Sequence, residues 1–348
     1  MTRRLLQAIA GAEHGGAETF FLRLTAALHR AGEPQRVLIR RDPSRAQSLR
    51  EAGVAVTELA FGGLLDLTTR LGFRREIAVW RPNIVLTWMS RATRFCPRGD
   101  FVHVGRLGGY YDLKYYRHCD QLIANTSAIV EYAVGNGWPR QRITHLPNFV
   151  PDAGAAAALP SEAVAADDRA PLALALGRLH PNKGFDFLLE ALAATAKVDL
   201  WIAGDGPLRP GLERLATRLG ITDRVRFLGW REDVPALMAS ADLLVCPSLY
   251  EPLGNVVIEA WSAGLPVVAT ASDGPAGLIT DGETGILVPL PGTNGDGPAP
   301  LACAIERLCA DPALRAKLSK AGRRAYEAEF TEPIVVSRYR RFFDRVTD

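Results

Sequence analysis

The sequence has few of the features that mark secreted, metal-binding or membrane-spanning proteins. Its 348 residues include five scattered cysteines and no Cys-x-x-Cys pair, which argues against a zinc site and a disulfide framework. Reduced thiols in a cytoplasmic protein are therefore expected. No apolar run reaches the roughly 18 to 20 residues that span a bilayer. The two arginines and short apolar run at the start resemble a signal peptide only superficially, and residues 5–10 are better interpreted as a first core strand.

Common phosphate- and metal-binding motifs are missing as well. The chain has no Asp-x-Asp motif, and its six histidines show no metal-ligand spacing. It also has no Gly-x-Gly-x-x-Gly fingerprint, no Walker loop and no nucleic-acid-binding motif. We therefore expect no cofactor, no metal ion and no nucleic-acid partner. Any bound phosphate would be neutralised by basic side chains and helix N-termini.

The charge is distributed unevenly along the chain. The net charge is only +3, but residues 1–150 hold 21 Lys and Arg against 12 Asp and Glu, a balance of +9. The remaining residues hold 20 against 26, a balance of −6. Two readings stay open: the arginines solubilise the surface, or the first half faces an anionic partner such as a membrane or a charged acceptor.

Short apolar runs alternate with amphipathic stretches in the first half, which predicts an α/β fold with a parallel sheet. The predicted strands are 5–10, 36–40, 54–61, 83–88, 100–107, 121–126 and 142–147. Residues 151–171, rich in Ala, Pro and acidic residues, are predicted to be a linker or loop.

The alternation then begins again, which predicts a second α/β unit. Its predicted strands are 172–179, 198–204, 224–230, 242–249, 265–270 and 284–290, with helices at 184–196, 208–219, 233–240 and 255–263 between them. Residues 291–300 read as a loop insertion, and the chain ends in helices. In such sheets ligands bind beyond the carboxyl ends of the strands, so the loops there are the candidate sites.

Two of these loops carry groups suited to a phosphate. Gly15 and Gly16 precede a predicted helix, where backbone N–H groups can bind an anion, although a simple tight turn explains them equally. Arg178 ends a predicted strand and Lys183 precedes the next helix, which predicts a cradle for a diphosphate. A basic loop with no ligand is the alternative.

Two further turns of the second half carry candidate binding residues. Gly204 lies in a Gly-Asp-Gly-Pro turn that would let the backbone approach a nucleoside. Trp230 follows a strand, where its indole would border a flat base or simply pack.

A pair of acids flanks the most informative turn. Glu251 follows the strand at 242–249, and Glu259 lies one turn into the next helix, at i+4 from Asn255. The Glu259 carboxylate can accept two ribose hydroxyls, while the N–H groups from Gly254 to Val256 can meet a phosphate.

Together these residues resemble the retaining glycosyltransferases of family four, which have the GT-B fold: two Rossmann-like, doubly wound domains facing a central cleft. The features that carry the resemblance are the Gly15–Gly16 loop, Arg178 with Lys183, the AGDGP turn at 203–207, the LGW run before Asp233, and the element from Glu251 to Glu259. The resemblance covers nearly all of 170–330 and, more loosely, 1–150. It implies an acceptor-binding domain at 1–165, a nucleotide-sugar-binding domain at 166–330, and a last helix at 331–348 that returns to the first domain.

The resemblance also assigns roles. Arg178 and Lys183 would hold the donor diphosphate, Glu259 the ribose, the backbone of 254–256 the phosphate, and Glu251 the transferred sugar. Catalysis would be metal-independent front-face transfer, in which cations stabilise the departing diphosphate. The family also places a histidine near the sugar, and here that position falls to His103 or to Arg106, with Arg106 nearer the strand end. The alternative is that His103 simply packs in the core.

The sequence thus predicts a hexosyltransferase that uses a UDP-, GDP- or ADP-sugar and a cell-envelope glycan or glycolipid acceptor, such as lipopolysaccharide core, exopolysaccharide or a lipid-linked sugar. It would be cytoplasmic, with the basic first domain contacting an anionic membrane from the inner face. The alternative is a nucleotide-sugar-binding or scaffolding protein of the same fold without turnover. The donor base, the sugar, the acceptor and the oligomeric state stay open.

Overall fold

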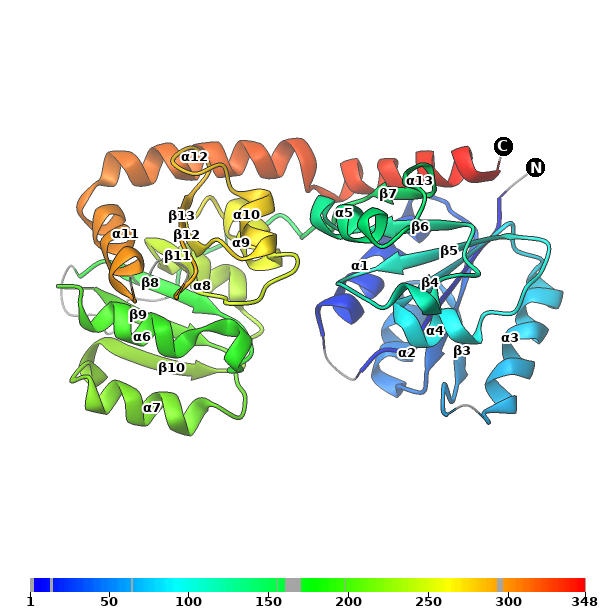
Figure 1. Ribbon diagram of the computed structural model, residues 1–348, viewed down its shortest axis with the longest axis horizontal. Coiled ribbons are helices and arrows are strands. Elements are labelled where there is room, and N and C mark those ends of the chain that lie inside the picture. The colour runs from blue at the N-terminus through cyan, green and yellow to red at the C-terminus, as the bar shows by residue number, and fades with distance from the viewer. Residues whose placement is uncertain are drawn as a thin grey trace. The chain divides into compact units, whose positions relative to one another are not determined.

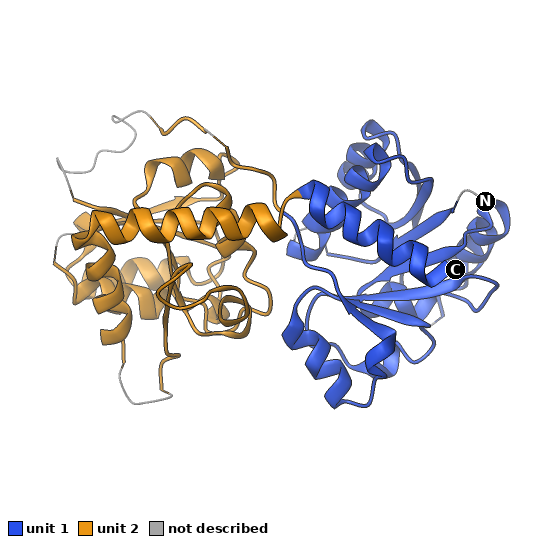
Figure 2. Ribbon diagram, turned by 90° about the horizontal axis from the view of Figure 1, so that it is seen from above, with its two compact units in different colours: residues 1–149, 332–348 blue, residues 150–331 orange. Residues whose placement is uncertain are grey.

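The chain forms two compact units, each with its own parallel sheet, in the computed structural model (Figure 1). The structure describes residues 3–12, 15–63, 65–154, 156–159, 170–196, 198–292 and 297–347. Unit 1 comprises Met1–Phe149 and Glu332–Asp348, and unit 2 comprises Val150–Thr331 (Figure 2).

Unit 1 has a seven-stranded sheet with the order β3-β2-β1-β4-β5-β6-β7, every pairing parallel. Its strands are β1 (Leu5–Ile9), β2 (Gln35–Arg40), β3 (Ala55–Leu59), β4 (Ile84–Trp88), β5 (Val102–Leu107), β6 (Gln121–Ala124) and β7 (Ile143–His145). Its helices are α1 (Gly16–Arg30), α2 (Pro43–Glu51), α3 (Leu67–Trp80), α4 (Met89–Phe95), α5 (Ser127–Gly135) and α13 (Glu332–Thr347), with short 3₁₀ turns η1 (Leu113–Tyr115) and η2 (Arg140–Arg142).

Unit 2 repeats this topology with six strands in the order β10-β9-β8-β11-β12-β13. Its strands are β8 (Leu172–Leu176), β9 (Asp199–Ala203), β10 (Val225–Gly229), β11 (Leu243–Cys246), β12 (Val267–Thr270) and β13 (Ile286–Val288). Its helices are α6 (Phe185–Ala193), α7 (Arg209–Arg218), α8 (Val234–Ser240), α9 (Asn255–Ser262), α10 (Asp273–Leu278), α11 (Ala299–Ala310) and α12 (Pro312–Glu329), with 3₁₀ turns η3 (Pro181–Lys183) and η4 (Thr222–Arg224).

Each strand predicted from the sequence is present, and the predicted α/β class and doubly wound sheets are confirmed. Most strands are shorter than the predicted runs, and in many of them the last residues of the run belong to the carboxyl-end loop. The run at 242–249, for example, forms a strand only from Leu243 to Cys246. Strand order reverses direction between β1 and β4 in unit 1 and between β8 and β11 in unit 2. These are the switch points at which ligands bind in such sheets.

The boundary between the units lies before the predicted linker. Val150 packs in a core cluster with Leu172 and Leu174 of β8, so unit 2 begins there and not at residue 166. Much of the predicted linker, at 155 and 160–169, lies outside the described residues, as do 293–296 of the predicted loop insertion.

The last helix belongs to unit 1. Its apolar face buries Val335, Tyr339, Phe342 and Phe343 in the same core cluster as strands β1, β2 and β4. The chain therefore starts and ends in one unit, as Figure 2 shows. Along the described part of the chain, no helix combines the length and apolar character that crossing a bilayer requires.

Candidate functional site

The switch point of unit 2 brings together two of the predicted loops. The loop after β8 carries Arg178 and Lys183, and the loop after β11 carries Glu251. Because β8 and β11 are adjacent and parallel, both loops leave the same edge of the sheet. A backbone hydrogen bond of 3.1 Å from Tyr250 N–H to the Asn182 carbonyl joins them.

Lys183 and Glu251 form an ion pair at this switch point. The Lys183 ammonium donates to Oε2 of Glu251, and both side chains are largely buried. The other carboxylate oxygen, Oε1, accepts the backbone N–H of Gly254 at 3.3 Å. One carboxylate therefore bridges a cation and the N-terminus of α9, the two kinds of group that bind a phosphate.

Helix α9 begins at this bridge and carries the polar side chains of Asn255 and Glu259. Gly254, at φ +78°, is the N-cap residue and turns the chain into the helix. Val257, Ile258, Ala260 and Trp261 are buried in the unit 2 core, whereas Asn255, Val256 and Glu259 are only partly buried. Asn255 and Glu259 therefore lie on one face of α9, one helical turn apart, as their spacing predicts.

Close approaches between loops shape the site, and the sequence did not reveal them. Gly274 N–H donates to the Glu251 carbonyl at 2.6 Å, and a Cβ on Gly274 would meet that oxygen at 2.6 Å and the Leu253 carbonyl carbon at 2.4 Å. At Gly204, φ is +145° and a Cβ would meet the Gly177 carbonyl oxygen at 1.9 Å. Glycine is required at both positions, because these loops touch backbone to backbone.

Two residues predicted for the donor site are exposed. Arg178 is exposed and forms no ion pair with any residue that the structure describes. Trp230 follows β10 with 72% of its surface exposed, so it is not a core residue. The next side chain, Arg231, forms a bidentate pair with Asp233, with distances of 2.8 and 2.5 Å.

In unit 1, Arg106 is buried at the carboxyl end of β5. Its Nε donates to the Tyr339 hydroxyl at 3.1 Å and an Nη donates to Oδ1 of Asn148 at 2.5 Å. The guanidinium also lies over the rings of Trp88 and Phe20, at 4.3 and 4.8 Å from their centroids. A cation fixed on all sides by polar and aromatic groups is held in one orientation. No local sequence pattern indicates Asn148 or Tyr339 as partners of Arg106, because they lie 42 and 233 residues away along the chain.

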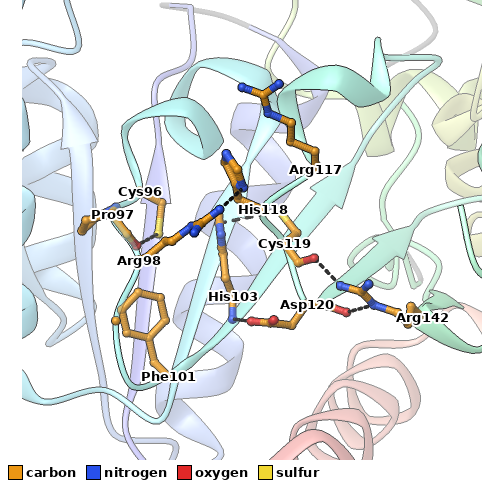
Figure 3. A pocket seen from close by; sticks show the side chains of 11 residues that line it. Cys96, Pro97, Arg98, Phe101, His103, Arg117, His118, Cys119, Asp120 and Arg142 are labelled. Atoms are coloured by element: carbon orange, nitrogen blue, oxygen red, sulfur yellow. Dashed lines mark hydrogen bonds between the residues drawn. The ribbon is translucent and has the colours of Figure 1, made fainter.

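His103 lies near the amino end of the same strand, away from Arg106. Its Nε2 is 3.0 Å from the Thr87 hydroxyl, and its backbone N–H donates to Asp120. Figure 3 shows the Asp120 carboxylate at this backbone N–H, and the ring Nε2 lies 3.8 Å from the Cys119 sulfur. Burial lowers the pKa of His103 to about 4, so it is neutral at physiological pH.

Gly15 is the N-cap of α1, as the sequence predicted, and Gly16 begins the helix. The buried Glu18 carboxylate also lies there: Oε1 accepts Ala12 N–H at 2.8 Å, and a Cβ on Gly15 would meet Oε2 at 2.3 Å. Residues 13–14 of this loop lie outside the described residues. In the described residues no three His, Cys, Asp or Glu side chains gather as a metal site would require.

Two doubly wound Rossmann-like units, with cationic and helix N-terminal groups at the switch point of the second, are the architecture of the GT-B glycosyltransferases. The comparisons support this class. Residues 14–153 match the family model for Glycosyltransferase Family 4, and residues 170–311 match the model for Glycosyl transferases group 1. The chain belongs to glycosyltransferase family 4.

Two relatives that match along nearly their whole length are glycosyltransferases as well. The chain is 36% identical over 334 residues to the lipopolysaccharide core biosynthesis glycosyltransferase LpsE of Rhizobium meliloti, covering 93% of this chain and 94% of the relative. It is 35% identical over 340 residues to LpsD of the same organism, covering 95% of each.

Solved structures show the same fold at lower identity. A glycosyltransferase from Rickettsia africae superposes with a TM-score of 0.87 at 17% identity, over 99% of this chain and 98% of that one. Alr3699/HepE of Anabaena, crystallised with UDP and glucose, gives 0.82 at 22% identity, over 99% of this chain and 100% of that one.

Proposed function

We propose that this glycosyltransferase moves a hexose from a nucleotide-diphosphate sugar to a cell-envelope glycan, with retention of configuration and without a metal ion. The observation that carries the proposal is the bridge from Lys183 through Glu251 to the Gly254 N–H at the switch point of unit 2. The acceptor classes are lipopolysaccharide core, exopolysaccharide and lipid-linked sugar. The names of the two Rhizobium relatives favour the first.

In this proposal the donor diphosphate takes the place of the Glu251 carboxylate. Arg178 and Lys183 hold the phosphates together with the N–H groups of residues 254–256, Glu259 holds the ribose hydroxyls, and Glu251 turns to the transferred sugar. Trp230 borders the base. Because Gly204 has no side chain, the nucleoside can approach the backbone there.

Bond breaking and bond making occur on one face of the sugar. The bond from the anomeric carbon to the leaving phosphate oxygen breaks, while the acceptor hydroxyl attacks from the same side. The hydroxyl proton passes to a phosphate oxygen of the leaving group. Because negative charge grows on the diphosphate in the transition state, Lys183 and Arg178 supply most of the stabilisation.

We assign the family's first-domain histidine position to Arg106. It stands at the carboxyl end of β5, the edge at which ligands bind, whereas His103 stands near the amino end and is neutral. Gly15 and Gly16 keep their predicted role at the N-terminus of α1 in this scheme.

A donor screen tests the proposal. Release of UDP, GDP or ADP from a panel of sugar nucleotides is measured with and without candidate acceptors, and transfer products are analysed for anomeric configuration and for sensitivity to EDTA. Lys183→Ala should lower turnover by roughly a hundredfold or more, because it removes a charge on the leaving group. Glu190→Gln, an exposed change on α6, is the control. Unchanged turnover in Lys183→Ala would refute the site.

For the membrane partner we propose that α3 contacts the inner face of an anionic bilayer. Leu67 and Leu71 are exposed on α3, at 66% and 64%, Leu65 is 93% exposed just before it, and the exposed Arg74 and Arg75 follow them. Apolar side chains flanked by arginines are typical of interfacial helices.

Vesicle sedimentation tests the membrane contact. The paired change Leu67→Ser and Leu71→Ser should weaken binding to vesicles with about 30 mol% anionic lipid, since apolar insertion and charge act together. Ala78→Ser, also exposed on α3, is the control. Binding that depends on neither anionic lipid nor salt would contradict the contact.

A further inference from the structure

Three adjoining hollows cross unit 1 beside α4, and we call them together the arginine trough. The first, of about 210 Å³, is lined by Gly62, Arg70, Arg91 and Arg94 among others. The second, of about 560 Å³, shares Arg70 and Arg94 with the first.

The third hollow, of about 360 Å³, continues from the second, with which it shares Cys96, Arg98, Arg117 and His118. Figure 3 shows it, with Arg98, Arg117 and Arg142 around its rim. The shared lining residues show that the three hollows adjoin one another.

The lining is strongly cationic. Its permanent cations are Arg70, Arg91, Arg94, Arg98, Lys114, Arg117 and Arg142. The described lining contains one carboxylate, Asp120, which accepts the His103 N–H. Two acids lie nearby: Asp112 pairs with Lys114 at 2.5 Å, and Asp66 accepts from Gly62, Thr68 and Thr69. The excess of positive charge is therefore large.

Several of these cations are fixed in position. Arg94 and Lys114 both lie over the Tyr115 ring, at 5.2 and 4.9 Å from its centroid, and Arg70 lies over the Phe95 ring at 5.5 Å. For Arg70 and Arg94 these contacts orient the side chains without using up their charge, so less conformational entropy is lost when an anion binds. Lys114 is also paired with Asp112 and therefore contributes less free charge.

The trough extends from the carboxyl ends of the unit 1 strands to their amino ends. The first hollow contains Gly62 and Gly63, which follow the carboxyl end of β3, and Arg91, in the first turn of α4 after β4. The third hollow contains Asp120 and Arg142, which directly precede β6 and β7. The arginine trough therefore begins at the carboxyl ends of the strands, where ligands bind in such sheets, and extends away from them.

We propose that the arginine trough binds the anionic groups of an extended glycan acceptor, with phosphate or carboxylate groups seated along it. The proposal rests on the proposed function, since it concerns that reaction's acceptor. Guanidinium groups bind phosphate and carboxylate in bidentate fashion, and a series of them suits a chain with several charges. Concave hollows fit a flexible chain better than the flat surface of a bilayer, so we assign the trough to the glycan and α3 to the membrane.

Binding of inorganic tripolyphosphate to the full chain tests the trough without turnover. The measurement uses the Arg178→Ala and Lys183→Ala background, so that phosphate binding in unit 2 is removed. Adding Arg94→Gln and Arg117→Gln should weaken tripolyphosphate binding about tenfold or more, since two charge-assisted contacts are lost. Arg214→Gln with Arg218→Gln, which removes the same charge from exposed positions on α7, should change it little.

A second arm measures vesicle binding of the same variants, and circular dichroism checks that each variant is folded. Equal weakening by the α7 control, or no weakening by the trough variant, would overturn the proposal. Loss of vesicle binding with tripolyphosphate binding unchanged would assign these arginines to the bilayer instead. If Arg94→Gln with Arg117→Gln does not fold, Arg91→Gln alone gives the same comparison. Donor hydrolysis without acceptor, measured separately on otherwise wild-type protein, tests the transferase reaction independently of the trough.

Discussion

At the scale of single residues, Glu251 occupies the place that the donor is proposed to take. Its carboxylate contacts both the Lys183 ammonium and the Gly254 N–H. A diphosphate at these contacts would repel the carboxylate, so we expect donor binding to move it. The ion pair is largely buried, and breaking it offsets part of the gain from binding the diphosphate.

Glu251→Gln tests this competition. Without the negative charge, Lys183 is free to meet phosphate, and the nucleoside diphosphate product should bind several-fold more tightly. Turnover should fall, since Glu251 is proposed to contact the sugar. Calorimetric titration and steady-state rates measure the two effects. Product affinity that falls together with turnover would show that Glu251 supports the phosphate site and does not compete with it.

His103 gives a prediction for pH. Its pKa is about 4 in the folded protein, against an ordinary 6.5, because the ring is buried. Below pH 6.5 the unfolded chain takes up a proton that the folded chain resists, so stability present above pH 6.5 is lost as pH falls toward 4. Between pH 7 and pH 5 this single group should lower the free energy of unfolding by about 2 kcal/mol.

Urea unfolding of wild type and His103→Gln at the two pH values measures that loss. The variant should lack this part of the pH dependence, while His29→Gln, at a partly exposed position of the same unit, should keep it. The same slope in wild type and His103→Gln would show that other groups cause the acid sensitivity.

At the scale of elements, local pattern was enough to find the strands and to place Arg178, Lys183, Glu251 and Glu259 in the loops and helix of one sheet edge. Periodicity and glycine turns are properties of neighbouring residues, so they can be read directly. What the pattern could not give are contacts between distant segments. Gly274 closing on Glu251, and Tyr339 accepting from Arg106, depend on tertiary packing that no short stretch encodes.

Tyr339→Phe tests how α13 supports β5. The change leaves Nε of a buried guanidinium without its acceptor, which should cost about 1–3 kcal/mol in the free energy of unfolding. Chemical denaturation measures it, with Tyr250→Phe at an exposed position as the control. A cost no larger than that of the control would mean that the Arg106–Tyr339 bond adds little to the packing of α13.

At the scale of the whole molecule, the two units have separate apolar cores. The clusters around β1 and β4 contain only residues of unit 1, and those around β8 and β11 only residues of unit 2. A ligand that binds one unit therefore stabilises that unit first.

Hydrogen exchange with nucleoside diphosphate present should follow this division. UDP, GDP and ADP are tested in turn, and the one that binds should protect amides at 177–184 and 250–257, because these loops form the proposed donor site. Lys183→Ala should abolish the protection. Protection confined to unit 1 would place the nucleotide elsewhere.

The return of α13 to the first unit makes unit 2 an uninterrupted insertion. Its two ends meet, since the Tyr326 hydroxyl donates to the Val150 carbonyl at 3.2 Å. We therefore expect that residues 150–331 can be exchanged between relatives as one segment, joined to unit 1 at two nearby positions. A chimera built this way would keep the whole of unit 1, including α13. A chimera fused at a single position would instead take α13 from the other protein.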